Sequence, residues 1–70
     1  MRYAVVIENA GQNYSAYAPD MPGCVATGRT AEEAGHRMRE AIAMHIEGLR
    51  ADGLAVPSPA SRVGYVDVAA

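Results

Sequence analysis

Three acidic residues stand at positions where a paired-carboxylate or metal site could form: Glu8, Asp20 and Asp67. Hydrolysis by two metal ions needs several carboxylates that converge on the ions. Glu8 and Asp67 fall near the ends of expected strands and are the only carboxylates there, which favours solvated strand ends over catalysis. No Gly-rich phosphate loop, nucleophile elbow or metal motif accompanies them. The sequence therefore predicts neither a catalytic site nor a bound metal or cofactor.

The other reactive side chains are those of one cysteine and two histidines. Their spacing is not that of a zinc site, and a single cysteine excludes an internal disulfide. Cys24 is a nucleophile only with a base beside it, and although the fold could supply one, the expected role is a small buried strand residue. His45 falls on the apolar stripe of a predicted helix, which favours a packed core or interface residue over a pH-sensitive contact with a partner.

Size and charge limit the class of protein. The 70 residues predict a single domain over residues 1–70, and because so small a domain buries only about 60% of its unfolded surface, we expect support from oligomerisation. The net charge is −2 and the six basic residues are spread along the chain, so direct binding to nucleic acid is not expected. No segment has the length of a signal sequence or membrane span, which predicts a cytoplasmic protein.

Apolar alternation predicts three short strands, over residues 2–9, 14–18 and 24–27. The short connections between them favour an antiparallel meander, because a parallel pair needs a long crossover. The first strand is apolar on both faces in its middle, with Val6 on the second face. Such a strand is expected inside a sheet that is covered from both sides.

One long amphipathic helix is predicted over residues 31–52. Thr30 and Glu33 have the spacing of a capping box at its start, and Gly53 supplies its stop. Gly35 and Gly48 lie inside it, and we expect a second element to approach the backbone closely there. The apolar stripe of the helix contains Ala31, Ala34, Met38, Ala41, Ile42, His45 and Leu49.

A fourth strand is predicted over residues 62–68, after a stiff connector that contains Pro57 and Pro59. The expected fold is therefore α+β with the order β-β-β-α-β. One helix, about 10–12 Å across, is too narrow for a four-stranded sheet of about 19 Å, so a second chain is expected to cover the rest. This predicts a homo-oligomer, a dimer or a tetramer. Its expected oligomer or core contacts are Val6, His45, Ile46 and Tyr65.

The loop over residues 19–24 is stiff, because two prolines fix φ and remove amide donors. As structure, it merely joins two strands. As function, its stiffness allows it to present Met21 to a partner at a low ordering cost. The candidate partner-binding residues are therefore Asp20, Met21, Pro22 and Gly23.

In their order and spacing, these features resemble the HicB-like antitoxins of bacterial toxin–antitoxin pairs. The resemblance covers nearly the whole chain and rests on residues 3–8, 14–18 and 19–24, Gly28, Thr30, residues 32–34 and 40–42, Glu47, Gly53, Pro57 and Pro59. It implies a fold similar to a truncated ribonuclease H sheet. It also implies a non-enzymatic protein that binds and neutralises a small basic ribonuclease toxin of the HicA type, for which an acidic chain is complementary.

Many members of that family carry a C-terminal segment that binds DNA. This sequence ends at Ala70, so the resemblance is to a short form without that segment. Two other functions stay open at this point. One is a degenerate metal-dependent nuclease on the ribonuclease H-like sheet, which would use Glu8 and Asp67. The other is a structural oligomer without a dedicated partner.

Overall fold

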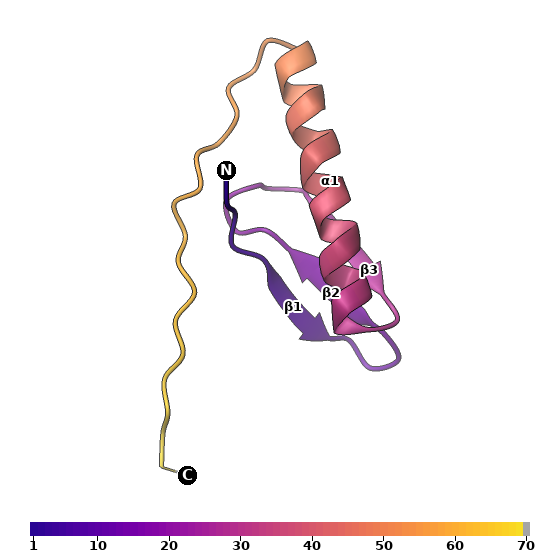
Figure 1. The fold of residues 1–70 in the computed structure, drawn as a ribbon, viewed down its shortest axis with the longest axis vertical. Coiled ribbons are helices and arrows are strands. Elements are labelled where there is room, and N and C mark those ends of the chain that lie inside the picture. Colours follow the sequence, from indigo (N-terminus) through magenta and orange to yellow (C-terminus); the bar gives the residue numbers. More distant parts are fainter. Residues whose placement is uncertain (70) are drawn as a thin grey trace.

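Three strands, one long helix and an extended C-terminal segment follow one another along the chain (Figure 1). This computed structural model describes residues 1–69. Strands β1 (Val6–Asn9), β2 (Tyr14–Tyr17) and β3 (Val25–Gly28) pair antiparallel in the order β1-β2-β3. Helix α1 (Ala31–Ala51) lies across one face of this sheet. The α+β class and the antiparallel meander are confirmed, but β1 begins at Val6 and not at residue 2.

The ends of α1 are set by local signals that the sequence announces. Thr30 Oγ1 accepts a hydrogen bond from the Glu33 N–H at 3.0 Å. The Glu33 carboxylate accepts the Arg29 N–H at 2.9 Å, one residue earlier than in a standard capping box. At the other end, Gly53 has a φ of 70°, and Leu54 donates to the Leu49 carbonyl at 2.8 Å. This is the Schellman arrangement that ends many helices.

The core lies between α1 and the β2 and β3 side of the sheet, and it is small. Two buried methionines, Met21 and Met38, supply its largest fully buried side chains. Close backbone approach matters at Gly28, where a Cβ would lie 2.5 Å from the Ala34 nitrogen. The buried residues are Ala16, Ala18, Met21, Cys24, Ala34 and Met38, all of them small or flexible.

The two helix glycines differ in their surroundings. A Cβ on Gly35 would lie 3.5 Å from Ile7 Cδ1, so β1 does approach the helix there. Apart from its chain neighbours and the adjacent helix backbone, no atom of residues 1–69 lies within 4 Å of a Cβ built on Gly48. The expectation that a second element packs against Gly48 is therefore wrong, since that residue lies on an exposed part of α1.

The face of the sheet opposite α1 carries an apolar row. The register places Val6 opposite Tyr17, and Tyr17 opposite Val25. Because side chains alternate along a strand and the neighbouring Ala16 is buried under α1, this row points away from the helix. Tyr17 is 42% exposed and Val25 is 69% exposed, so nothing in residues 1–69 covers the row fully.

The fourth strand predicted over residues 62–68 is not formed. Residues 54–69 have no strand pairing, and the sheet of the described chain has three strands. A strand is held by backbone hydrogen bonds to a neighbouring strand, and residues 62–69 run past β1 and away from the body without pairing with it. The Cα radius of gyration, 13.7 Å, exceeds the value of about 11 Å expected for a compact domain of this length. A three-stranded sheet also gives no support to the expected likeness to ribonuclease H.

Replacement of the two glycines by alanine should have opposite effects on stability. Gly28→Ala is expected to lower the free energy of unfolding by about 1–3 kcal/mol, because the new methyl group meets the Ala34 backbone. Gly48→Ala is the matched control and should raise it by about 0.5–1 kcal/mol. Urea unfolding followed by circular dichroism measures both. A Gly28→Ala protein as stable as the parent would contradict the described approach of β3 to α1.

Candidate partner-binding site

The loop between β2 and β3 is held by short turns. Met21 donates its N–H to the Ala18 carbonyl, and Cys24 donates to the Met21 carbonyl, both at 3.1 Å. Gly23 has a φ of 81°, which a residue with a side chain rarely adopts. The Met21 side chain is 0% exposed and packs in the core. The expectation that this loop presents Met21 to a partner is therefore wrong, because Met21 instead fastens the loop to the core.

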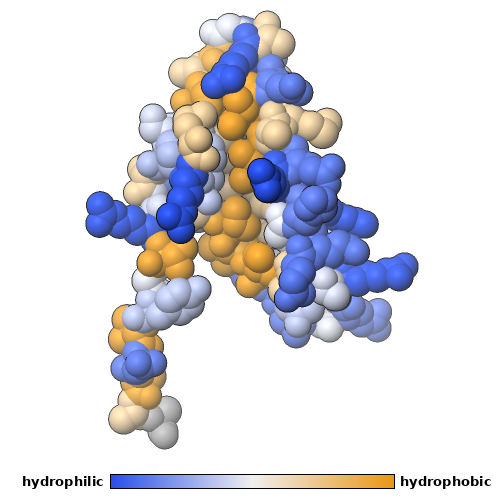
Figure 2. Space-filling model, in the orientation of Figure 1, coloured by the Kyte–Doolittle hydropathy of each residue, from blue (hydrophilic) through white to orange (hydrophobic). Residues whose placement is uncertain are grey.

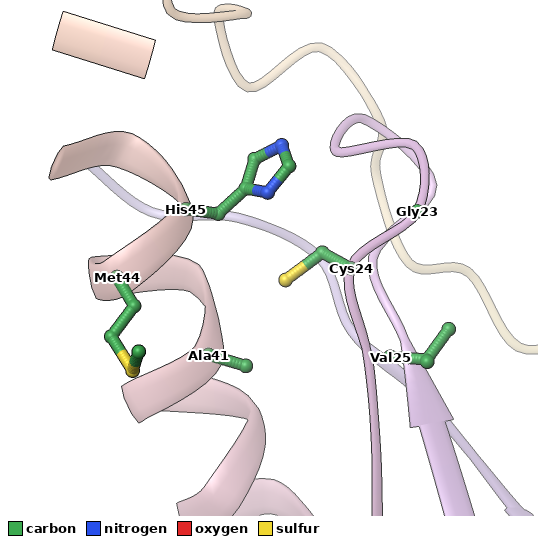
Figure 3. Close-up of a pocket in the computed structure, with 6 residues that line it drawn as sticks. All are labelled: Gly23, Cys24, Val25, Ala41, Met44 and His45. Carbon is green, nitrogen blue, oxygen red and sulfur yellow. The ribbon is translucent and has the colours of Figure 1, made fainter. Parts of the chain in front are cut away.

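The outer part of the loop borders a cleft of about 350 Å³ against the middle of α1 (Figure 3). Pro22 and Gly23 are both exposed in this loop, and Gly23 lines the cleft. We call this hollow the loop–helix cleft. It is lined by Gly23, Cys24, Val25, Ala41, Met44 and His45.

Cys24 and His45 face the loop–helix cleft from opposite walls, one from the start of β3 and the other from α1. Cys24 is only 5% exposed, and this burial raises the pKa of its thiol. The thiol therefore stays protonated at neutral pH, and no hydrogen bond joins it to His45 within residues 1–69. The fold brings together the two residues that sequence alone did not connect, but it does not activate the cysteine.

The edges of the cleft are apolar and exposed. Met44 is 72% exposed on the α1 side, and Val25 lines the β3 side although its own side chain, 69% exposed, belongs to the row that points away from α1. Apolar side chains around one polar group, here the half-buried His45, are typical of a surface that contacts another protein. Methionine in particular adapts to different partners, because its side chain is unbranched and flexible.

The four expected oligomer or core contacts do not form one surface. Val6 lies in the apolar row on the open face of the sheet, and His45 lines the loop–helix cleft. Ile46 packs partly buried against the core cluster. Tyr65 is 93% exposed in the C-terminal segment. The sequence indicated four side chains as contact residues, but it did not show that they lie in different parts of the molecule.

Asp20 is engaged within the chain. Its carboxylate accepts the Ala60 N–H at 2.9 Å, the Ser61 N–H at 2.8 Å and the Ser61 hydroxyl at 2.8 Å. The Ser61 amide, then the Ala60 amide and the Ser61 hydroxyl, lower the pKa of this carboxyl. We call this set of hydrogen bonds the tail anchor. Nearby, the Tyr3 hydroxyl donates to the Pro57 carbonyl at 2.6 Å.

The tail anchor has no local signal in the sequence. The partners are separated by 40 and 41 residues, and each side of the contact looks like an ordinary loop. The anchor removes Asp20 from the set of freely available partner-binding residues. Of the four residues expected in that role, only Pro22 and Gly23 remain exposed.

The remaining carboxylates do not converge. Glu8 and Asp67 are both exposed, and no three His, Cys, Asp or Glu residues among residues 1–69 are grouped so as to hold a metal ion. In the same range, no helix combines the length and the apolar character that crossing a bilayer requires.

An antiparallel meander crossed by one helix, with an exposed apolar cleft, defines a small α+β domain with a surface suited to protein contact. The chain belongs to the HicB-like antitoxins of bacterial toxin–antitoxin systems, whose family model matches residues 3–68.

Two relatives match most of this chain. The chain is 40% identical over 57 residues to the uncharacterized 14.9 kDa protein in the rep-hol intergenic region of Haemophilus phage HP1, which is 81% of this chain but only 43% of the phage protein. It is also 40% identical over 58 residues to the UPF0150 protein of Helicobacter pylori strain J99, covering 83% of this chain and 81% of that protein. The chain thus spans less than half of the phage relative.

The structural neighbour is a chain of the HicA3 and HicB3 toxin-antitoxin complex. The TM-score is 0.73 with 33% sequence identity, and the match covers 86% of this chain and 70% of that one. The family and the three-strand and helix arrangement are therefore shown together.

The tail anchor should depend on pH through Asp20. Because the pKa of this carboxyl is lowered in the folded chain, the anchor is complete above the ordinary value of 3.8 and is lost as the pH falls through the lowered pKa. Backbone NMR should show the Ala60 and Ser61 amide signals moving toward unstructured values in that acid range. Asp20→Ala should produce the same shifts at neutral pH, and Asp67→Asn should not. Unmoved amide signals in Asp20→Ala would exclude the anchor.

Proposed function

We propose that this chain binds and neutralises a small, basic ribonuclease toxin of the HicA type. The observation that carries the proposal is the likeness, at 33% identity, to a chain from a solved toxin-antitoxin complex. Membership of the antitoxin family over residues 3–68 supports it. The role is non-enzymatic, since the protonated Cys24 thiol and the scattered carboxylates offer no chemistry of their own.

The loop–helix cleft is the proposed contact for the toxin. Gly23 lines it, beside the exposed Pro22, on a loop that Met21 fastens to the core, so little order has to be gained on binding. Met44 supplies exposed apolar area on the α1 side. The net charge of −2 favours approach of a basic partner and its selection over acidic ones.

The same proposal places the protein in the cytoplasm as a homo-oligomer. The single cysteine is unpaired, as is usual in a reducing compartment. A core of six buried residues is small for a domain that must be stable alone. The exposed apolar row of Val6, Tyr17 and Val25 is further surface that a second chain can cover.

A charge placed in the cleft should weaken toxin binding. Met44→Arg is expected to raise the dissociation constant at least about tenfold, because it replaces exposed apolar area by a charge of the same sign as the toxin. Ala43→Arg adds the same charge one residue away, outside the cleft lining, and should bind as the parent does. Binding to a small basic toxin of the HicA type is measured by calorimetry, and neutralisation by RNA cleavage assays.

Two results separate the parts of this proposal. If the parent chain neither binds nor inhibits that toxin, the proposed function is wrong. If both arginine variants inhibit equally well and remain folded, the function stands and the contact surface lies elsewhere.

A further inference from the structure

The C-terminal tail, residues 62–69, has the side chains of a strand but no neighbour. Val63 and Tyr65 are 61% and 93% exposed, and Val66 and Val68 are 85% and 78% exposed. These residues alternate, so that an extended tail is apolar on both faces. Figure 2 shows apolar residues recurring along the tail and an apolar area on the body beside it. Apolar surface of this extent is expected to be covered by a partner.

Strand β1 lacks a neighbour on one of its edges in the described chain. It pairs only with β2, so its other edge is unpaired within residues 1–69. Ile7, on the side that faces α1, is 41% exposed. A groove of about 190 Å³ opens beside it, lined by Met1, Tyr3, Val5, Gly35, Arg39 and Ile42. A strand added at this edge would place one row of side chains over the groove and the other beside Val6 on the open face.

The tail of the same copy is held apart from this edge. The tail anchor fixes Ala60 and Ser61 to Asp20. A gap of about 510 Å³ then separates residues 61–63 from residues 2–5. Beyond the gap the tail runs away from its own sheet (Figure 1). The anchor therefore sets where the tail leaves the body.

We propose that two copies of this chain exchange their tails. Residues 62–69 of each copy add as a fourth strand to the free edge of β1 in the other, around a twofold axis. The exchange satisfies the open backbone groups of β1 and covers one apolar face of the tail over the groove, while the other face extends the apolar row that contains Val6. It specifies the interface of the proposed homo-oligomer and does not depend on which toxin is bound.

Removal of the tail tests the exchange. Sedimentation at micromolar concentration should give a dimer for the parent chain and a monomer for a chain that stops after Ser61, which keeps the tail anchor. Tyr65→Ser with Val66→Lys should also give a monomer, with no risk to the fold, because both residues are exposed in the single chain. Met44→Arg is the matched control and should remain a dimer.

The strand itself is tested by hydrogen exchange and NMR. The outward amides of β1 should be protected in the parent and lose at least about tenfold in protection when the tail is removed. In a mixed sample of labelled and unlabelled chains, contacts of the Tyr65 ring with β1 should appear between copies. A dimer that persists without the tail overturns the proposal.

A monomer with protected β1 amides also overturns it, because the tail would then pair within its own chain. A parent chain that is monomeric until toxin is added, with β1 protected only in the complex, assigns the edge to the toxin and overturns it too. Toxin neutralisation is measured separately with Met44→Arg, so failure of the exchange does not count against the proposed function.

Discussion

Three hydrogen bonds to one carboxylate connect the two parts of this molecule. The Asp20 oxygens accept two amides and a hydroxyl from Ala60 and Ser61, which fixes the direction in which the chain leaves the body. Asp20 can do this because Met21, the next residue, is buried and holds the loop still. A loop that the core immobilises therefore serves two purposes. It positions one side of the loop–helix cleft, and it sets the path of the tail.

The second constraint is the mismatch between one helix and the sheet. Helix α1 lies mainly over β3 and β2, which leaves β1 partly open on the helix side and the row of Val6, Tyr17 and Val25 open on the other. The buried core has no aromatic residue, and its two methionines carry much of the volume. A domain built in this way has little stability in reserve, because so small a chain buries only a modest share of its surface.

Features encoded within a few residues could be predicted from sequence. Thr30 and Glu33 predict the start of α1, Gly53 predicts its end, and alternation predicts the three strands that form. Contacts between distant residues could not. The same exposed-looking loop pattern hides a buried Met21, and nothing near Asp20 indicates its partners 40 residues away. Residues 62–68 have a strand pattern, but a strand forms only where a second segment lies alongside it. Within residues 1–69 no strand lies alongside residues 62–68.

The buried state of Cys24 has a consequence for the chemistry of the whole surface. The only thiol of the chain is protonated and enclosed between β3 and α1, so peroxides and soft electrophiles meet no reactive sulfur except in methionine side chains. Oxidation of a cysteine therefore neither forms nor breaks the contacts that this protein makes. The extent of such an association depends on the concentrations of its components and not on the redox state of a thiol.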